Sequence, residues 1–170
     1  RPGEAHDAWL AARGDDIVDP VTLYIAQTHA LTGPLSLTSA IPSWPPLAIQ
    51  TELWAEGGIT APRLAVMERV TKPKTSILGR HSDTPGGTVF VAADQDIAML
   101  HALEVSPGER RKGVGRTLIT AAANWAESVG ATWLTLAVTA ANKPANALYQ
   151  GVGMQTVGAY HYRRAPEVTA

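Results

Sequence analysis

Hydrophobic and polar positions follow two different periods along this 170-residue chain. Residues 116–129 carry an apolar side chain at every third or fourth position, which predicts one amphipathic helix ended by Gly130. Other apolar runs are rich in β-branched residues and predict strands. The predicted strands span residues 21–26, 75–80, 88–93, 97–105, 132–138 and 154–163.

The order of these elements predicts the fold class. Further helices are expected at residues 5–12, 47–56, 62–70 and 144–152, and residues 32–46 are expected to form a linker rich in Pro, Ser and Thr. A Pro-Gly turn signal within residues 82–87 helps to join three strands into an antiparallel meander. The strand–helix–strand order that follows makes strands 97–105 and 132–138 parallel. We therefore predict an α/β fold with a mixed, mostly antiparallel sheet flanked by helices.

Composition and charge narrow the classes of function. The formal net charge is −1, which gives no general reason to expect nucleic acid or an anionic membrane as a partner. The chain has no cysteine, so disulfides, thiolate metal sites and cysteine nucleophiles are excluded, and a reducing cytoplasm fits the composition. His6, His29, His81 and His161 lack metal-ligand spacing, and we predict no metal site.

One loop concentrates positive charge between a predicted strand and the amphipathic helix. Residues 105–117 contain Gly113 and Gly115, with basic residues at positions 110, 111, 112 and 116. A helix N-terminus has backbone N–H groups without intrahelical partners, and glycine lets an anion approach them closely. Strand, glycine-rich turn and helix N-terminus together are typical of a phosphate site. A basic, solvated loop is the alternative on spacing alone.

Two motifs resemble those of the GCN5-related N-acetyltransferases (GNAT). The pattern Arg-x-x-Gly-x-Gly of residues 110–115 resembles the coenzyme A pyrophosphate loop of that family. The pattern Asn-x-x-Ala-x-x-Leu-Tyr of residues 142–149, followed by Gly153-Met154, resembles its C-terminal motif. The resemblance covers residues 75–163. It implies the family's fold, with splayed central parallel strands, and acetyl-CoA as co-substrate.

The resemblance implies a role for each residue of the two motifs. Backbone N–H groups of the loop would hold the pyrophosphate, and the basic side chains would add charge. The splayed strands would leave backbone groups free to bind pantetheine and polarise the thioester carbonyl. Asn142 would bind coenzyme A or cap its helix. The implied cofactor-binding residues are Leu103, Glu104, Val105, Arg110, Arg111, Lys112, Gly113, Val114, Gly115, Arg116, Thr117, Asn142, Ala145 and Tyr149.

The implied reaction needs a base and an acid. An alkyl ammonium has a pKa of roughly 10.4, so a base must take a proton from the acceptor. Glu104 and His101 are the candidates, and their spacing of three places them on opposite faces of a strand unless a bulge intervenes. Tyr149 is the predicted general acid, because a phenol near ~10 can protonate a thiolate near ~8.5 at a cost of roughly 2 kcal/mol. A tyrosine that only packs is the alternative.

A short internal match links the two ends of the chain. Ala8-Trp9-Leu10, Gly14 and Val18 match Ala147-Leu148-Tyr149, Gly153 and Val157 at one offset of 139 residues. We therefore expect residues 1–35 to be the tail of a preceding, degenerate half of the same family plus a linker. Residues 36–170 would be the acetyltransferase domain. A first residue other than Met fits this expectation.

The sequence thus predicts an enzyme that moves an acetyl group from acetyl-CoA to a primary amine by direct transfer. The alternative is a non-catalytic acyl-CoA-binding sensor or scaffold, whose cofactor site is intact but whose acceptor site is inactive. The expected partners are acetyl-CoA and an amine, without nucleic acid or membrane. The sequence leaves open whether the chain forms a homodimer.

Overall fold

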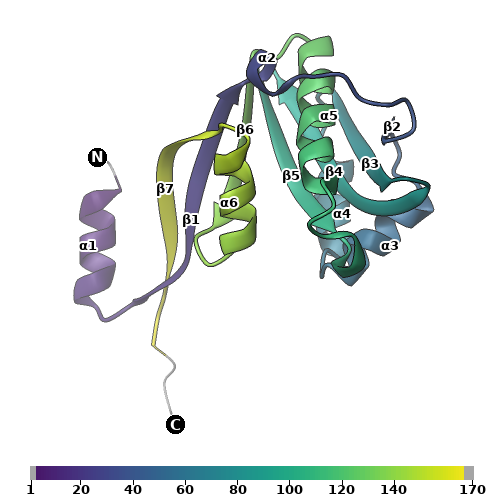
Figure 1. The fold of residues 1–170 in the computed structure, drawn as a ribbon. Coiled ribbons are helices and arrows are strands. Elements are labelled where there is room, and N and C mark those ends of the chain that lie inside the picture. Colours follow the sequence, from purple (N-terminus) through teal and green to yellow (C-terminus); the bar gives the residue numbers. More distant parts are fainter. Residues whose placement is uncertain (1–2, 167–170) are drawn as a thin grey trace.

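A computed structural model describes residues 3–166 as one seven-stranded sheet with helices on both faces (Figure 1). The strands lie in the order β2-β3-β4-β5-β6-β1-β7. Their bounds are β1 Asp16–Gln27, β2 Ala40–Ser43, β3 Lys74–His81, β4 Thr84–Asp94, β5 Ile97–Val105, β6 Trp133–Thr139 and β7 Gln155–Arg164. Neighbours pair antiparallel except β5 and β6, which are parallel. The predicted α/β class with a mixed, mostly antiparallel sheet is confirmed.

Helices α5 and α3 lie on opposite faces of this sheet (Figure 1). Val89 and Val91 of β4 belong to the larger core beneath α5, whereas Phe90 between them packs with Trp54 of α3. Successive strand residues point to opposite faces, so this alternation separates the two layers. The helices are α1 Glu4–Ala12, α2 Thr28–Leu31, α3 Ala48–Glu56, α4 Ala61–Glu68, α5 Val114–Ser128 and α6 Lys143–Gly151, with a 3₁₀ turn η1 at Pro107–Glu109. Within residues 3–166 no helix is long and apolar enough to cross a bilayer.

Two local predictions are wrong. Strand β2 forms within the predicted linker 32–46 and pairs antiparallel with β3. The predicted turn at residues 82–87 is confined to Ser82 and Asp83, while residues 85–87 extend β4. Gly87 suits the strand because a Cβ there would lie 2.6 Å from the backbone oxygen of Glu104. Cross-strand pairing thus outweighs the local Pro-Gly turn preference.

The parallel strands β5 and β6 separate toward their carboxyl ends. Their pairing runs from Ile97 opposite Trp133 to Leu100 opposite Leu136. Both strands continue beyond these pairs, to Val105 and Thr139, without pairing to each other. The predicted splay is therefore present. It leaves one side of the end of β5 free of sheet hydrogen bonds, next to the start of α5.

Strand β1 brings the N-terminal segment into the sheet. It lies between β6 and β7 and is antiparallel to both. The described part of residues 1–35 therefore packs on the same sheet as the rest of the chain. Residues 1–2 and 167–170, the outer ends of the two predicted domains, lie outside the described residues.

Candidate active site

The N-terminus of α5 lies at the point where β5 and β6 separate. Gly113 precedes the helix with φ +90°, and no side chain caps the first turn. The N–H of Thr117 donates to the Gly113 carbonyl at 3.0 Å, so the donors without an intrahelical partner belong to the residues between them. A Cβ at Gly113 would meet nothing within 4 Å. An open, uncapped helix N-terminus can bind an anion.

Gly115 has a different role from Gly113. A Cβ on Gly115 would lie 2.8 Å from Cδ2 of Leu148. The missing side chain therefore lets α5 and α6 pack closely, whereas Gly113 provides the positive φ that the turn requires. The open space that the sequence assigns to both glycines exists only at Gly113.

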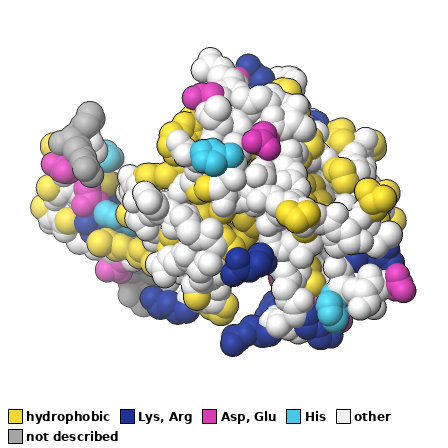
Figure 2. Space-filling model, turned by 45° about the horizontal axis from the view of Figure 1, so that its top comes forward, with side chains coloured by type: hydrophobic (Ala, Val, Ile, Leu, Met, Phe, Trp, Pro, Cys, Tyr) yellow, Lys and Arg dark blue, Asp and Glu magenta, His cyan; other side chains and the backbone are white. Residues whose placement is uncertain are grey.

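Basic side chains surround this helix end. Figure 2 shows Lys and Arg side chains on both sides of a hollow along the lower edge of the molecule. Arg110 donates from Nε to the Val105 carbonyl at 3.1 Å and lies 3.4 Å from Glu104. The other contacts are Lys112 with Glu109 and Arg116 with the Gly151 carbonyl. Among the described residues Arg111 has no polar partner, and its φ is +66°.

A β-bulge brings His101 and Glu104 to the same face of β5. His101 lies opposite Phe90, and Glu104 lies opposite Thr88, so one extra residue is inserted in β5 between these pairs. Ala102 within the bulge has φ +52°. Phe90 and Thr88 are two residues apart and share a face, and their partners therefore share it too. His101 and Glu104 were expected on opposite faces unless a bulge intervened. The bulge is present, so they lie on the same face.

Trp54 supports the bulge from α3. Its indole Nε1 donates to the Ala102 carbonyl at 2.8 Å, and the side chain is fully buried. The bulged carbonyl has turned out of the regular ladder, and this hydrogen bond satisfies it. Helix α3 thereby fixes the strand conformation that presents both candidate bases.

A cavity of about 650 Å³ opens beside His101. Its lining includes Phe90, Met67 and Arg63, the last of which is exposed and has no polar partner within the described residues. Burial lowers the pKa of His101, and the charge of Arg63 lowers it further. His101 is therefore neutral at pH 7 and able to accept a proton.

Glu104 lies beside the Gly57-Gly58 turn that follows α3, and its charge acts on Tyr149 of α6. A Cβ on Gly57 would lie 2.5 Å from the Glu104 carboxyl carbon, and the adjacent Gly58 lines the cavity. Burial raises the pKa of Glu104, although the nearby Arg110 guanidinium opposes the shift. A carboxylate with a raised pKa is a stronger base than an exposed one.

Tyr149 approaches the gap from α6. Its side chain is 5% exposed, and its ring centroid lies 5.8 Å from that of Tyr24. The Tyr149 hydroxyl makes no hydrogen bond within residues 3–166, unlike the Tyr24 hydroxyl, which donates to Asn146 at 3.0 Å. Burial and the charge of Glu104 raise the pKa of Tyr149 to about 12. The phenol is thus protonated at neutral pH and has a free donor.

Asn142 caps the helix that carries Tyr149. Its Oδ1 accepts from the N–H of Ala145 at 3.2 Å, and Pro144 occupies the first turn. The capping role proposed from the sequence is confirmed. Ala145 itself is partly buried against the larger core.

Comparison with known proteins identifies the family. Residues 43–154 match the model of the Acetyltransferase (GNAT) family. The chain belongs to this family. The match includes the α5 turn and the helix with Tyr149.

Relatives and solved structures agree with the assignment. Streptothricin acetyltransferase of Streptomyces lavendulae is 38% identical over 84 residues, 41% of this chain and 44% of the relative. A GCN5-related N-acetyltransferase from Kribbella flavida has a TM-score of 0.69 at 21% identity, over 99% of this chain and 66% of that one. A tandem GNAT protein from the clavulanic acid biosynthesis pathway has a TM-score of 0.68 at 16% identity, over 98% and 60%. The chain spans less than half of the curated relative and under two thirds of these solved chains.

The two sequence motifs gave no sign that α3 and α4 contribute to the candidate site, although Trp54 was expected to pack in the core, as it does. Trp54 and Arg63 are far from both motifs in sequence: Trp54 reaches β5 at Ala102, and Arg63 lines the same cavity as His101. A Trp followed by Gly57-Gly58 gives no signal that it supports a strand. No group of metal-binding side chains occurs in the described part of the chain.

Proposed function

We propose that the chain transfers the acetyl group of acetyl-CoA to the nitrogen of a primary amine. One observation carries the proposal: the separation of β5 from β6 brings three groups around a single gap. These are the open N-terminus of α5, the shared face of His101 and Glu104, and the unpaired hydroxyl of Tyr149. Each corresponds to a need of acetyl transfer, namely cofactor binding, proton removal and proton donation.

The residues at α5 suit the phosphates of coenzyme A. The first turn has N–H groups without helical partners, no capping side chain and space at Gly113. Arg111 is available to add charge, because no described side chain pairs with it. The carbonyl and N–H groups at the end of β5 lie on the same side, where an extended pantetheine arm can pair with the strand. Arg110 bonds the Val105 carbonyl and would give up this contact when the arm binds.

The chemistry then follows from the positions of the side chains. Glu104 or His101 accepts a proton from the acceptor ammonium and releases it to solvent, and the nitrogen of the free amine forms a bond to the thioester carbonyl carbon. The carbon–sulfur bond breaks, and the sulfur takes a proton from the Tyr149 hydroxyl. The amide nitrogen loses its second proton, directly or through water, to the tyrosinate, so one ammonium and one thioester give one amide, one thiol and one released proton per turnover.

The acceptor is expected in the cavity beside His101. Phe90 and Met67 provide apolar contact, and the unpaired Arg63 adds a positive charge. A guanidinium near the acceptor favours an amine that also carries a carboxylate over a polycation. Because one relative is a streptothricin acetyltransferase, streptothricin should be among the amines tested.

A screen of amines with acetyl-CoA, followed by release of free thiol, tests the proposal. The chain has no cysteine, so a thiol reagent reports only coenzyme A. We expect turnover with one or more primary amines, and mass spectrometry should locate the acetyl group on nitrogen. Acetyl-CoA binding by calorimetry without turnover across amino acids, aminoglycosides, streptothricin and peptide amines would instead indicate an acyl-CoA sensor.

A further inference from the structure

Two helix–strand units lie side by side at one end of the sheet. Helix α1 with β1 and helix α6 with β7 have the same layout, and both helix boundaries and the strand starts are 139 residues apart. The helices begin at Glu4 and Lys143 and contain nine residues each, and the strands begin at Asp16 and Gln155. Gly14 and Gly153 connect helix to strand with φ +90° and +92°.

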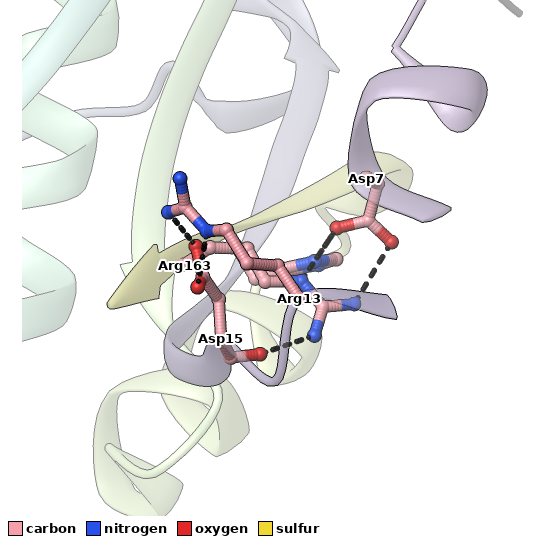
Figure 3. A network of polar contacts seen from close by, with 5 residues as sticks. Asp7, Arg13, Asp15 and Arg163 are labelled. Atoms are coloured by element: carbon pink, nitrogen blue, oxygen red, sulfur yellow. Dashed lines mark hydrogen bonds and ion pairs between the residues drawn. The ribbon is translucent and has the colours of Figure 1, made fainter. Parts of the chain in front are cut away.

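The contacts between the units repeat at the same offset. Tyr24 of β1 donates to Asn146 of α6 at 3.0 Å. At the equivalent positions Arg163 of β7 donates to Asp7 of α1, at 2.8 and 3.0 Å (Figure 3). A groove lies beside each contact, of about 440 Å³ between α6 and β1 and about 660 Å³ between α1 and β7. Each helix therefore packs on the strand of the other unit.

This arrangement is a local two-fold. The antiparallel ladder joins residues 16–25 of β1 to residues 164–155 of β7, and Val21 lies opposite Tyr160, its counterpart at the offset. A two-fold that exchanges β1 and β7 also requires equivalent neighbours on their outer edges. The outer edge of β1 pairs with β6, whereas β7 is the last strand of the sheet.

Exposed apolar side chains occur on the helix and the two strands at this end of the sheet. Val157 and Tyr162 of β7 are 61% and 55% exposed, and Trp9 of α1 and Ile17 of β1 are 57% and 52% exposed. Large exposed apolar groups on an open strand edge are typical of an interface. Figure 1 places α1, β1 and β7 at one end of the sheet, away from α5.

We propose that α1–β1 is the end of a preceding unit of the same fold in the same polypeptide, and that its counterpart of β6 pairs antiparallel with β7. The offset places that strand on the seven residues directly before Arg1, because β6 is Trp133–Thr139. The pair Val21 and Thr139 then sets the register: Tyr160 lies opposite the residue directly before Arg1. The sheet continues through both units.

Strand β6 of a second copy of this chain cannot occupy the same edge. In each copy β6 already pairs with β5 on one side and with β1 on the other, so it has no edge to offer β7. In the preceding unit the counterpart of β6 has a free edge. The last strand of that unit is β1, and β1 lies between β6 and β7 in this sheet. That unit also lacks the proposed acid, because Leu10 stands at the position equivalent to Tyr149.

A disulfide in the full-length polypeptide tests the pairing, and the absence of native cysteine in the 170 residues makes this practical. One variant combines Tyr160→Cys with a cysteine directly before Arg1, and a control combines Val157→Cys with the same upstream cysteine. Any cysteines further upstream are first replaced by serine. We expect an intramolecular disulfide in the first variant and at least tenfold less in the second. Hydrogen exchange should show protected amides along β7.

Three outcomes would overturn the inference. The first is a folded full-length protein, by circular dichroism, in which neither cysteine pair closes. The second is a disulfide that forms only between two polypeptides, which would assign the β7 edge to a second copy. The third is an intact mass showing that the native chain begins at Arg1.

Discussion

The units α1–β1 and α6–β7 share a backbone layout but not their chemistry. Helix α6 starts with the capping side chain of Asn142, whereas α1 starts at Gly3, where no side chain caps the helix. Tyr149 is buried against the larger core, and no residue of α1 is buried. The contact to the opposite strand is a neutral hydrogen bond for α6 and an ion pair for α1.

The difference shows which features the fold needs and which the site needs. Helix length, the positive-φ glycine and the antiparallel ladder occur in both units, so they belong to the fold. The capping Asn142 and the tyrosine occur only in the unit that faces the gap between β5 and β6. The proposed chemistry of this chain thus depends on a few side chains placed on a backbone layout that occurs twice.

The largest expected effect comes from removing the hydroxyl that α1 lacks. In Tyr149→Phe we expect kcat to fall about 10²-fold or more, with acetyl-CoA affinity nearly unchanged, because the ring packing is kept. With a pKa of about 12, transfer to a free thiolate near ~8.5 is uphill by about 5 kcal/mol. A thiolate buried beside the ring is desolvated as well, and its raised pKa narrows that gap. Steady-state kinetics and calorimetry measure the two quantities.

Tyr24→Phe is the matched control. It removes a hydroxyl from the ring next to Tyr149, one that bonds Asn146 and Gln150. Stability should fall by roughly 1 kcal/mol, and kcat should change less than threefold. A Tyr149→Phe enzyme that turns over at nearly the parent rate would return Tyr149 to a packing role and make the two units chemically alike.

The second largest effect is expected from a substitution in β5, the strand that carries the candidate base Glu104. Glu104→Gln keeps the shape and removes the base, so the rate at pH 7 should fall about tenfold or more and recover as pH rises and free amine accumulates. In the parent enzyme the acidic limb should lie above the ordinary glutamate range, since burial raises the pKa of Glu104. A pH–rate profile of kcat/KM measures both.

His101→Gln separates the two candidate bases. If Glu104 is the base, the His101 variant keeps the shape of the profile and changes mainly KM for the amine, because His101 lines the acceptor cavity. An unaltered profile in Glu104→Gln, with loss of the acidic limb in His101→Gln, would exchange their roles.

The sequence predicted the elements that depend on local pattern. The stripe of residues 116–129 predicted α5, and the strand–turn–helix order placed Gly113 at its N-terminus. The C-terminal motif placed Asn142 and Tyr149 on one helix, as found. These signals are local, because a helix or a cap depends on residues within one or two turns.

The parts that were missed depend on contacts between distant residues. The bulge at Ala102 exists because β4 fixes the register on both sides of it and Trp54 bonds its carbonyl. Strand β2 has four residues, including Pro42, and forms only because β3 offers an edge. The place of β1 between β6 and β7 requires strands more than 100 residues apart in sequence, and alternation alone cannot specify it.

A smaller effect is expected at the helix starts. Asn142→Ala removes the acceptor for the Ala145 N–H, so the free energy of unfolding should fall by about 1 kcal/mol. Gly3→Ala at the equivalent position should change it by less than about 0.5 kcal/mol, because α1 has no side-chain cap to lose. Urea unfolding measures both. Equal changes in the two variants would mean that Asn142 contributes no more to its helix than Gly3 does.

The smallest effect separates the two inter-unit contacts by pH. Hydrogen bonds from Arg163 and His161 hold the pKa of Asp7 below its ordinary value of 3.8. Ionised Asp7 therefore stabilises the docking of α1 at pH values above 3.8. This stabilisation is lost progressively as the pH falls below 3.8. The Tyr24–Asn146 contact has no carboxylate to protonate.

Between pH 6 and 3, hydrogen exchange corrected for intrinsic rates should show α1 losing protection before α6. Asp7→Asn should weaken α1 already at pH 6 and remove this pH dependence. If both helices lose protection together in the parent chain, acid acts on the whole fold, and the ion pair at Asp7 does not set the difference between the units.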